Sequence, residues 1–190
     1  MQTKNAISGI AAAALWAISA APAAADRPDI WSGFYFGANA GYGTVRDSSP
    51  KISGAVGGVH AGYNHQLGSV VLGVEADYSW SGMEGTSSFS TGSGTGTVKV
   101  GVDDFWSVRA RLGLLATPNL MIYGTAGYGG LNASATATLG TATATARGSS
   151  EGFLGGGGVE YAFTSNILGR VQGIGGEDIV VVRGGLSFKF

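Results

Sequence analysis

One segment of the chain alternates apolar and polar side chains with a strict period of two. From residue 70 to residue 80 the even positions are apolar, whereas the odd positions include the carboxylates Glu75 and Asp77. This alternation predicts a β-strand with one apolar and one polar face. A strand that crosses a membrane needs roughly 9 to 11 residues, which this segment supplies. Because a charged face cannot contact lipid, it has to point into a closed structure.

Seven further segments repeat the pattern between turn signals. Together they predict an all-β fold, an eight-stranded antiparallel transmembrane β-barrel of the outer-membrane type. In the fifth segment both faces contain apolar residues, and we expect the face with Ile122 and Tyr128 to contact lipid. The seventh segment is the shortest and contains Arg170. The predicted strands are residues 31–45, 54–66, 70–82, 105–117, 120–131, 152–163, 167–173 and 179–190.

The connections between these segments alternate in length. Tight turns at 66–69, 117–119 and 164–166 alternate with long Ser/Thr/Gly/Ala-rich stretches at 82–104 and 132–151. Outer-membrane barrels combine short periplasmic turns with long outer loops, so both chain ends are expected on the periplasmic side. The Ala/Thr-rich part of the second stretch is expected to be a mobile surface loop or an extension of the strands on either side.

The start of the chain has the pattern of a secretory signal peptide. Lys4 precedes a short apolar run that ends in Pro-Ala-Ala-Ala, and small residues at Ala23 and Ala25 predict cleavage before Asp26. A retained anchor helix is the alternative, but Pro22 would end that helix where an anchor has to continue. We therefore expect a signal peptide at residues 1–25 and one outer-membrane β-barrel domain at residues 26–190.

Composition excludes some classes of function. The formal net charge is −1, and no basic stripe indicates nucleic-acid binding. Cysteine is absent, although small exported domains often carry disulfides. A closed barrel provides another source of stability, because every backbone N–H and C=O group pairs with a neighbouring strand.

The assigned faces gather charged side chains inside the predicted barrel. The interior of an eight-stranded barrel is largely filled by side chains, so we expect opposite charges there to pair as a structural plug. A selective pore or relay is the alternative. The predicted interior charge cluster consists of Glu75, Asp77, Arg109, Arg111, Glu160, Arg183 and Lys189.

Catalysis and cofactor binding have little support. Barrel enzymes that modify lipids need a nucleophile with an adjacent base, and the two histidines, His60 and His65, point to opposite faces of one strand. No serine is evidently placed beside His60, which we interpret as a structural polar residue. The predicted outer loops lack His and Cys, so we expect no metal, no cofactor and no enzymatic activity.

Aromatic residues gather near both ends of the predicted strands. This distribution is typical of the interfacial girdles of membrane barrels. We expect Trp31, Tyr63, Phe163 and Phe190 in the periplasmic girdle and Tyr42, Trp80, Trp106 and Tyr128 in the outer girdle.

Six stretches, in order, carry a family resemblance. They are WSGFYFGANAGYG (31–43), GVHAGYN (58–64), VLGVEAD (71–77), SVRARLG (107–113), YGTAG (123–127) and GGGVEYA (156–162). With them the chain resembles the porin-family, opacity-type surface antigens of alphaproteobacteria. The resemblance implies an eight-stranded barrel whose last strand is read by the barrel-assembly machinery. The residues that match this assembly signal are Leu186, Phe188 and Phe190. The seventh segment departs from the family, which has a longer strand there.

The sequence therefore predicts a protein of the Gram-negative cell outer membrane with a structural and surface-interaction role. Its expected partners are outer-membrane lipid, the barrel-assembly machinery, and an extracellular or host ligand at the outer loops. A narrow channel for small solutes or ions is the alternative function, and a lipid-modifying enzyme is a third.

Overall fold

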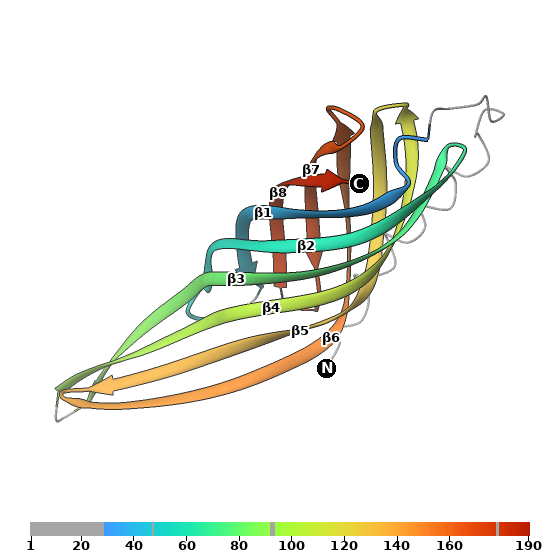
Figure 1. Cartoon of the computed structure of the whole chain (residues 1–190). Coiled ribbons are helices and arrows are strands. Elements are labelled where there is room, and N and C mark those ends of the chain that lie inside the picture. The colour runs from blue at the N-terminus through green and yellow to red at the C-terminus, as the bar shows by residue number, and fades with distance from the viewer. Residues whose placement is uncertain (1–28, 47, 92–93, 178) are drawn as a thin grey trace.

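The computed structural model describes residues 29–46, 48–91, 94–177 and 179–190. These residues form a closed barrel in which each strand pairs antiparallel with the next and β1 pairs with β8, so the predicted eight-stranded barrel is confirmed. The strands are β1 (Gly33–Val45), β2 (Ser53–Leu67), β3 (Val70–Thr91), β4 (Gly94–Thr117), β5 (Leu120–Leu139), β6 (Ala142–Ala162), β7 (Ile167–Gly175) and β8 (Ile179–Lys189). Figure 1 shows their arrangement. The predicted cleavage site at Ala23, Ala25 and Asp26 lies outside the described residues.

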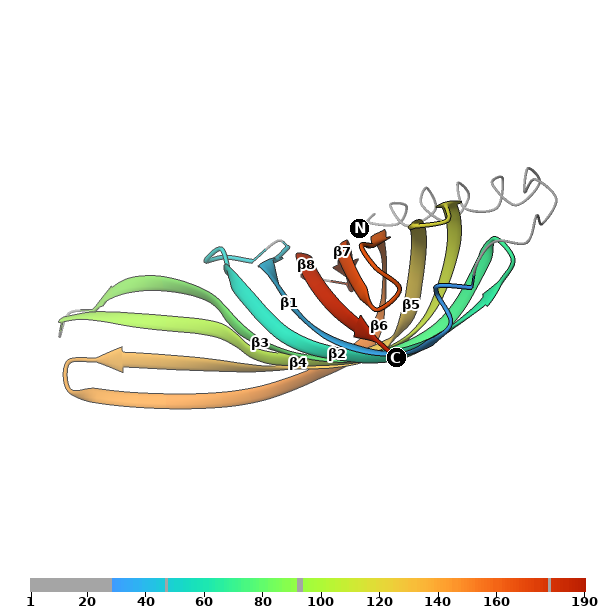
Figure 2. The ribbon, with the colours of Figure 1, turned by 45° about the horizontal axis from the view of Figure 1, so that its top comes forward.

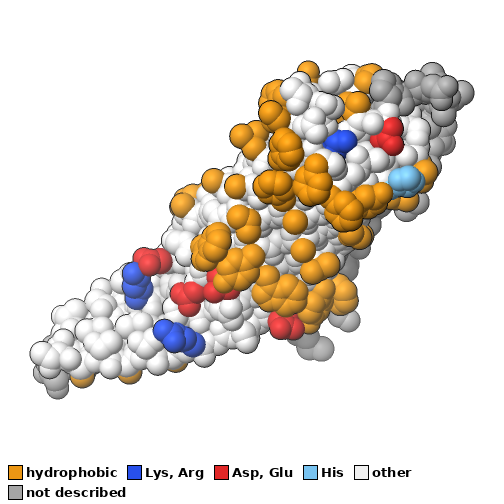
Figure 3. All heavy atoms as spheres, in the orientation of Figure 1, with side chains coloured by type: hydrophobic (Ala, Val, Ile, Leu, Met, Phe, Trp, Pro, Cys, Tyr) orange, Lys and Arg blue, Asp and Glu red, His pale blue; other side chains and the backbone are white. Residues whose placement is uncertain are grey.

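The alternation of side chains divides the barrel into an outer and an inner face. On β3, Val74 is 57% exposed while Glu75 is 2% exposed. On β5, Ile122 is exposed and Tyr123 is buried, so the expected lipid-facing side of that strand is confirmed. Figure 3 shows the apolar side chains gathered over the barrel. Within the described part of the chain, no helix is long and apolar enough to span a membrane.

Two of the predicted loops are strands. β3 runs on to Thr91 and β4 begins at Gly94, while β5 runs on to Leu139 and β6 begins at Ala142. The prediction of a loop at 82–104 is therefore wrong. In the second stretch, 132–151, the chain extends the flanking strands, which was one of the two predicted alternatives. Pairing between β4 and β5 reaches Gly96↔Leu139, so the four strands form one sheet whose backbone groups satisfy one another. We call this sheet the extension, and it projects beyond the barrel (Figures 1 and 2).

The extension begins where the strand register shifts. Irregularities occur between Trp80 and Met83 on β3 and between Val102 and Asp104 on β4. Bulges of this kind bend a strand and increase its twist, which agrees with the bend of the extension away from the barrel in Figure 2.

The seventh strand is longer than predicted, from Ile167 to Gly175. It is accommodated by the glycine run on β6, because a Cβ atom at Gly158 would lie 2.3 Å from the carbonyl oxygen of Val171. The close approach of β6 and β7 therefore needs a residue without a side chain at this position.

Apolar clusters fill the inside of the barrel at both ends. One contains Val71, Leu115, Met121 and Leu168 together with Trp31, and the other contains Val56, Met83, Val102 and Val181. The placement of Trp31 in the periplasmic girdle is wrong, because its side chain is fully buried and its Nε1 donates a hydrogen bond to the carbonyl oxygen of Pro118 at 3.0 Å. Trp31 precedes the first strand, so the strand alternation does not determine where its ring points.

Candidate functional site

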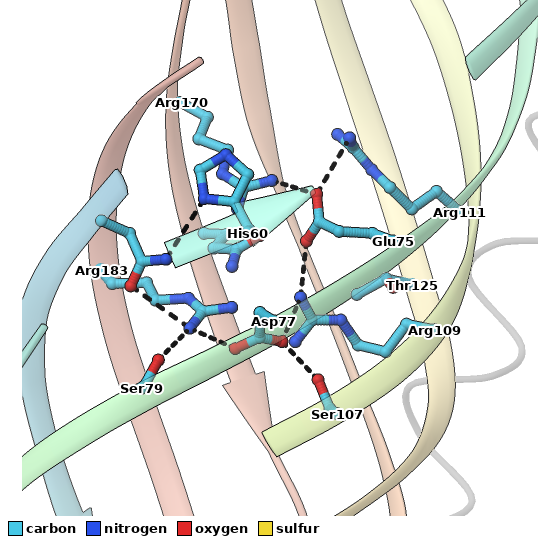
Figure 4. Close-up of polar contacts among 12 residues, drawn as sticks. His60, Glu75, Asp77, Ser79, Ser107, Arg109, Arg111, Thr125, Arg170 and Arg183 are labelled. Carbon is cyan, nitrogen blue, oxygen red and sulfur yellow. Dashed lines mark hydrogen bonds and ion pairs between the residues drawn. The ribbon is translucent and has the colours of Figure 1, made fainter. Parts of the chain in front are cut away.

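Seven charged side chains meet inside the barrel, and Figure 4 labels all of them except Glu160. They come from β3, β4, β6, β7 and β8, and each is at most 6% exposed. Four are guanidinium groups and three are carboxylates, so the group carries one net positive charge. We call it the interior cluster. Its members are Glu75, Asp77, Arg109, Arg111, Glu160, Arg170 and Arg183.

Glu75 is the central carboxylate of the interior cluster. Its Oε1 lies 2.6 Å from Nη2 of Arg109, which stands directly opposite on β4. Its Oε2 lies 3.3 Å from Nη1 of Arg111 and also pairs with Nη1 of Arg170. One carboxylate therefore binds three guanidinium groups, two from β4 and one from β7.

Asp77 and Glu160 extend the ion pairs to the rest of the ring. Asp77 pairs with Arg183 of β8 at 2.8 Å and with Arg109 at 2.9 Å, and it accepts a hydrogen bond from the hydroxyl of Ser107. Glu160 of β6 pairs with Arg111 at 2.6 Å. The contacts form one network, because Arg109 and Arg111 each bind two carboxylates.

Tyr35 links this network to β1. Its hydroxyl donates to Oε2 of Glu75 at 2.8 Å and accepts from Nη1 of Arg111 at 2.6 Å. Gly62 on β2 leaves the space for the ring, because a Cβ atom there would lie 2.4 Å from the Tyr35 hydroxyl. The Arg111 guanidinium lies 4.2 Å from the ring centre of Tyr123, a cation–π contact that stabilises it further.

We expect Tyr35→Phe to lower the free energy of unfolding by about 1 to 3 kcal/mol, because it leaves two buried charged partners without their shared hydroxyl. Tyr42→Phe on the same strand is the matched control, since the Tyr42 hydroxyl contacts Ser53 at an exposed position. Urea-induced unfolding in lipid vesicles measures both. A loss of equal size in the two variants would show that the buried hydroxyl has no special role.

His60 lies beside the cluster and next to a serine that sequence analysis missed. Its Nε2 is 2.7 Å from Oγ of Ser187, and its Nδ1 is 3.3 Å from Nδ2 of Asn39. Arg183 donates to Oδ1 of Asn39, which orients the amide so that its NH₂ group faces the imidazole. The amide nitrogen can only donate, so Nδ1 accepts and Nε2 carries the proton. In this tautomer His60 donates to Ser187 and cannot take a proton from it.

The structure separates one predicted member from the cluster and adds another. The placement of Lys189 in the cluster is wrong, because its Nζ donates to the carbonyl oxygen of Ser32 at 2.8 Å at the end of the barrel. Arg170 was not predicted as a member of the cluster. The one feature of the sequence that indicates its position is the alternation on β7, where Val171 faces outward and Arg170 therefore faces inward. The other six predicted members are in contact with one another. The three residues of the predicted assembly signal, Leu186, Phe188 and Phe190, are exposed on the outer surface.

A cavity of about 200 Å³ lies between the cluster and the outer rim of the barrel. Phe105, Leu131 and Ile174 are among its lining residues, and Arg109 is the member of the cluster that it reaches. Among the described residues, no other member of the interior cluster lines this cavity. No group of three or more His, Asp or Glu residues in the described ranges is arranged to hold a metal ion.

Comparison with known proteins identifies relatives and folds similar to this one. A family model described as "Outer membrane protein beta-barrel domain" matches residues 10–171. A 31 kDa outer-membrane immunogenic protein of Brucella melitensis is 38% identical over 165 residues, which cover 72% of this chain and 66% of the relative. A 22 kDa outer membrane protein of Rhizobium leguminosarum is 34% identical, and the match covers 75% of this chain and 62% of that protein. Both relatives extend beyond the matched region.

Two solved structures show the same fold at low sequence identity. Neisserial surface protein A has a TM-score of 0.54 and 19% identity, and the match covers 84% of this chain and 98% of that one. The N-terminal β-barrel domain of Pseudomonas aeruginosa OprF has a TM-score of 0.51 and 16% identity, and the match covers 84% of this chain and 98% of that domain.

Proposed function

The chain belongs to the outer-membrane β-barrel family, and from this membership we propose that it is a plugged structural barrel that presents its extension at the cell surface. The main observation that supports this proposal is the ion pair between Glu75 and Arg170. It joins β3 to β7, which stand opposite each other in the ring of strands. A contact between opposite walls closes the lumen at the level of the interior cluster, and the cavity above it reaches no farther than Arg109.

Conductance tests the plug against the alternative of a narrow channel. We expect the purified protein to produce no reproducible single-channel steps in planar bilayers, whereas an open porin measured in the same bilayers does. The physical reason is that charges paired in the lumen exclude a continuous path for ions, so Arg109→Gln and Arg111→Gln have no step to abolish. Steps of constant size that vanish in these variants would show that the cluster lines a pore.

The extension is the part that we propose as the interaction surface. The outer half of β6, from Ala142 to Glu151, is exposed along its whole length, and the ion pair between Glu84 and Lys99 is half exposed. The Brucella relative is named for its immunogenicity, which supports a surface that is reached from outside the cell. An epitope tag inserted at Gly148 should bind antibody on intact cells. A tag that becomes accessible only after the outer membrane is broken would contradict this orientation.

The proposal includes three further parts. Residues 1–25 are removed on export, the barrel-assembly machinery reads Leu186, Phe188 and Phe190, and the protein performs no catalysis. The protonation of His60 supports the last part, because a histidine that donates to Ser187 does not activate it. N-terminal sequencing of the mature protein tests the first part and is expected to begin at Asp26.

A further inference from the structure

The outer half of β6 has a free edge. β6 pairs with β5 from Ala142 onward, but it pairs with β7 only from Gly155 to Ala162. Among the described strands, none pairs with the other edge of β6 between Ala142 and Leu154, and Figures 1 and 2 show β6 at the border of the extension. A row of unpaired backbone N–H and C=O groups is a template for another strand.

This edge carries few of the devices that normally prevent strand addition. Proteins protect edge strands with charged side chains, especially lysine, with proline or with a bulge. Residues 142–154 contain no lysine and no proline, and the register with β5 runs through them without a shift. Their alternating threonines favour strand geometry. The two charged residues on this edge are Arg147 and Glu151.

The positions of these two charges make the edge complementary to itself. Arg147 and Glu151 lie four residues apart, so they share one face of the strand. If two copies of the edge pair antiparallel with Ser149 at the centre, Arg147 of each copy stands opposite Glu151 of the other. A centre at either charged residue instead places like charges opposite each other, which is unfavourable. The charges therefore select one register, and the pairing of residues 145–153 stays within the free edge.

We propose that the β6 edges of two copies pair antiparallel around Ser149 and join two outer membranes. Two identical antiparallel strands are related by a two-fold axis perpendicular to them, so the barrels lie at opposite ends of the shared sheet. Barrels placed in this way belong to facing membranes. The inference rests on the proposed outward orientation of the extension.

Clustering of vesicles tests the contact. The full barrel domain is folded into phosphatidylcholine vesicles that carry one of two lipid dyes, and clustering is measured by light scattering and by the co-localisation of the dyes. We expect the unaltered protein to cluster vesicles. Arg147→Glu alone and Glu151→Arg alone should each reduce clustering about tenfold or more, because both cross-strand pairs become repulsive. Mixing vesicles of the two variants should restore clustering, because each mixed contact again pairs opposite charges.

Lys51→Glu is the control, since it reverses an exposed charge in the loop between β1 and β2, outside the extension, and should leave clustering unchanged. Three results would overturn the proposal. They are no clustering by the unaltered protein, clustering that persists in Arg147→Glu, and no recovery in the mixture. Clustering that persists in both single variants would mean that another part of the extension forms the contact. Antibody access to the Gly148 tag, on separate vesicles that carry only the tagged protein, shows whether the extension points outward, so a failure of orientation is distinguished from a failure of pairing.

Discussion

Glu75→Gln is expected to lower the free energy of unfolding of the barrel by about 3 to 5 kcal/mol, the usual cost of removing one partner from a buried ion pair. The Glu75 carboxylate binds Arg109, Arg111 and Arg170, and the side chain is almost completely buried. Glutamine keeps the size of the residue but removes its charge. The net charge of the interior cluster then rises from +1 to +2 without access to water, which raises the free energy of the folded state.

Urea-induced unfolding in lipid vesicles, followed by tryptophan fluorescence, measures this loss. Glu84→Gln is the matched control, because the Glu84 side chain pairs with Lys99 while 54% exposed, and an exposed pair contributes about 1 kcal/mol or less. The double variant Glu75→Gln/Arg170→Gln returns the cluster to a net charge of +1. It should lose less stability than the sum of the two single losses, and strictly additive losses would contradict the coupling of these residues.

The alternation of side chains predicted which residues enter the barrel, but not the height at which each one lies. Period two assigned Glu75, Arg109 and Lys189 to the inner face, and all three side chains are buried. Lys189 nevertheless binds Ser32 near the end of the barrel, because it is the last residue of its strand. The contact between Glu75 and Arg170 was not predictable either, since pairing across the lumen depends on the stagger of the strands around the whole ring.

The extension was missed at residues 82–104, and it was one of two alternatives for the Ala/Thr-rich part of residues 132–151, because both of its faces meet water. Threonine and alanine alternate in residues 135–138 and again in residues 141–146, but this alternation has no strongly apolar face for a hydrophobicity pattern to detect. A composition rich in Ser, Thr and Gly then favours the prediction of a loop. The strands form because β4 and β5 continue to pair past the barrel rim, as at Val100↔Ala135, and such non-local pairing is not visible in the local sequence.

Gly127→Val is expected to prevent the barrel from closing. Gly127 of β5 stands opposite Arg109 of β4. A Cβ atom at this position would lie 2.0 Å from the carbonyl oxygen of Val108 and 2.6 Å from Cα of Arg109. These are backbone atoms, so the clash cannot be relieved by a change of side-chain rotamer. β4 and β5 would have to separate at the level where the side chains of the interior cluster pair. The loss in folding free energy should therefore equal or exceed the roughly 1 to 3 kcal/mol that overpacking usually costs.

Heat-modifiable gel migration measures the effect, since a folded barrel that is not heated migrates differently from the unfolded chain. We expect Gly127→Val to lose its folded band, because strands that are held apart by a clash of backbone atoms cannot close the ring. Gly148→Val is the matched control, because no atom lies within 4 Å of a Cβ at that position on the extension, and its folded band should keep its intensity. Equal folded bands in the two variants would contradict the close approach of β4 and β5. Four guanidinium groups fill this cross-section of the barrel. The ring can therefore close only if the inward-facing residue beside Arg109, Gly127, has no side chain.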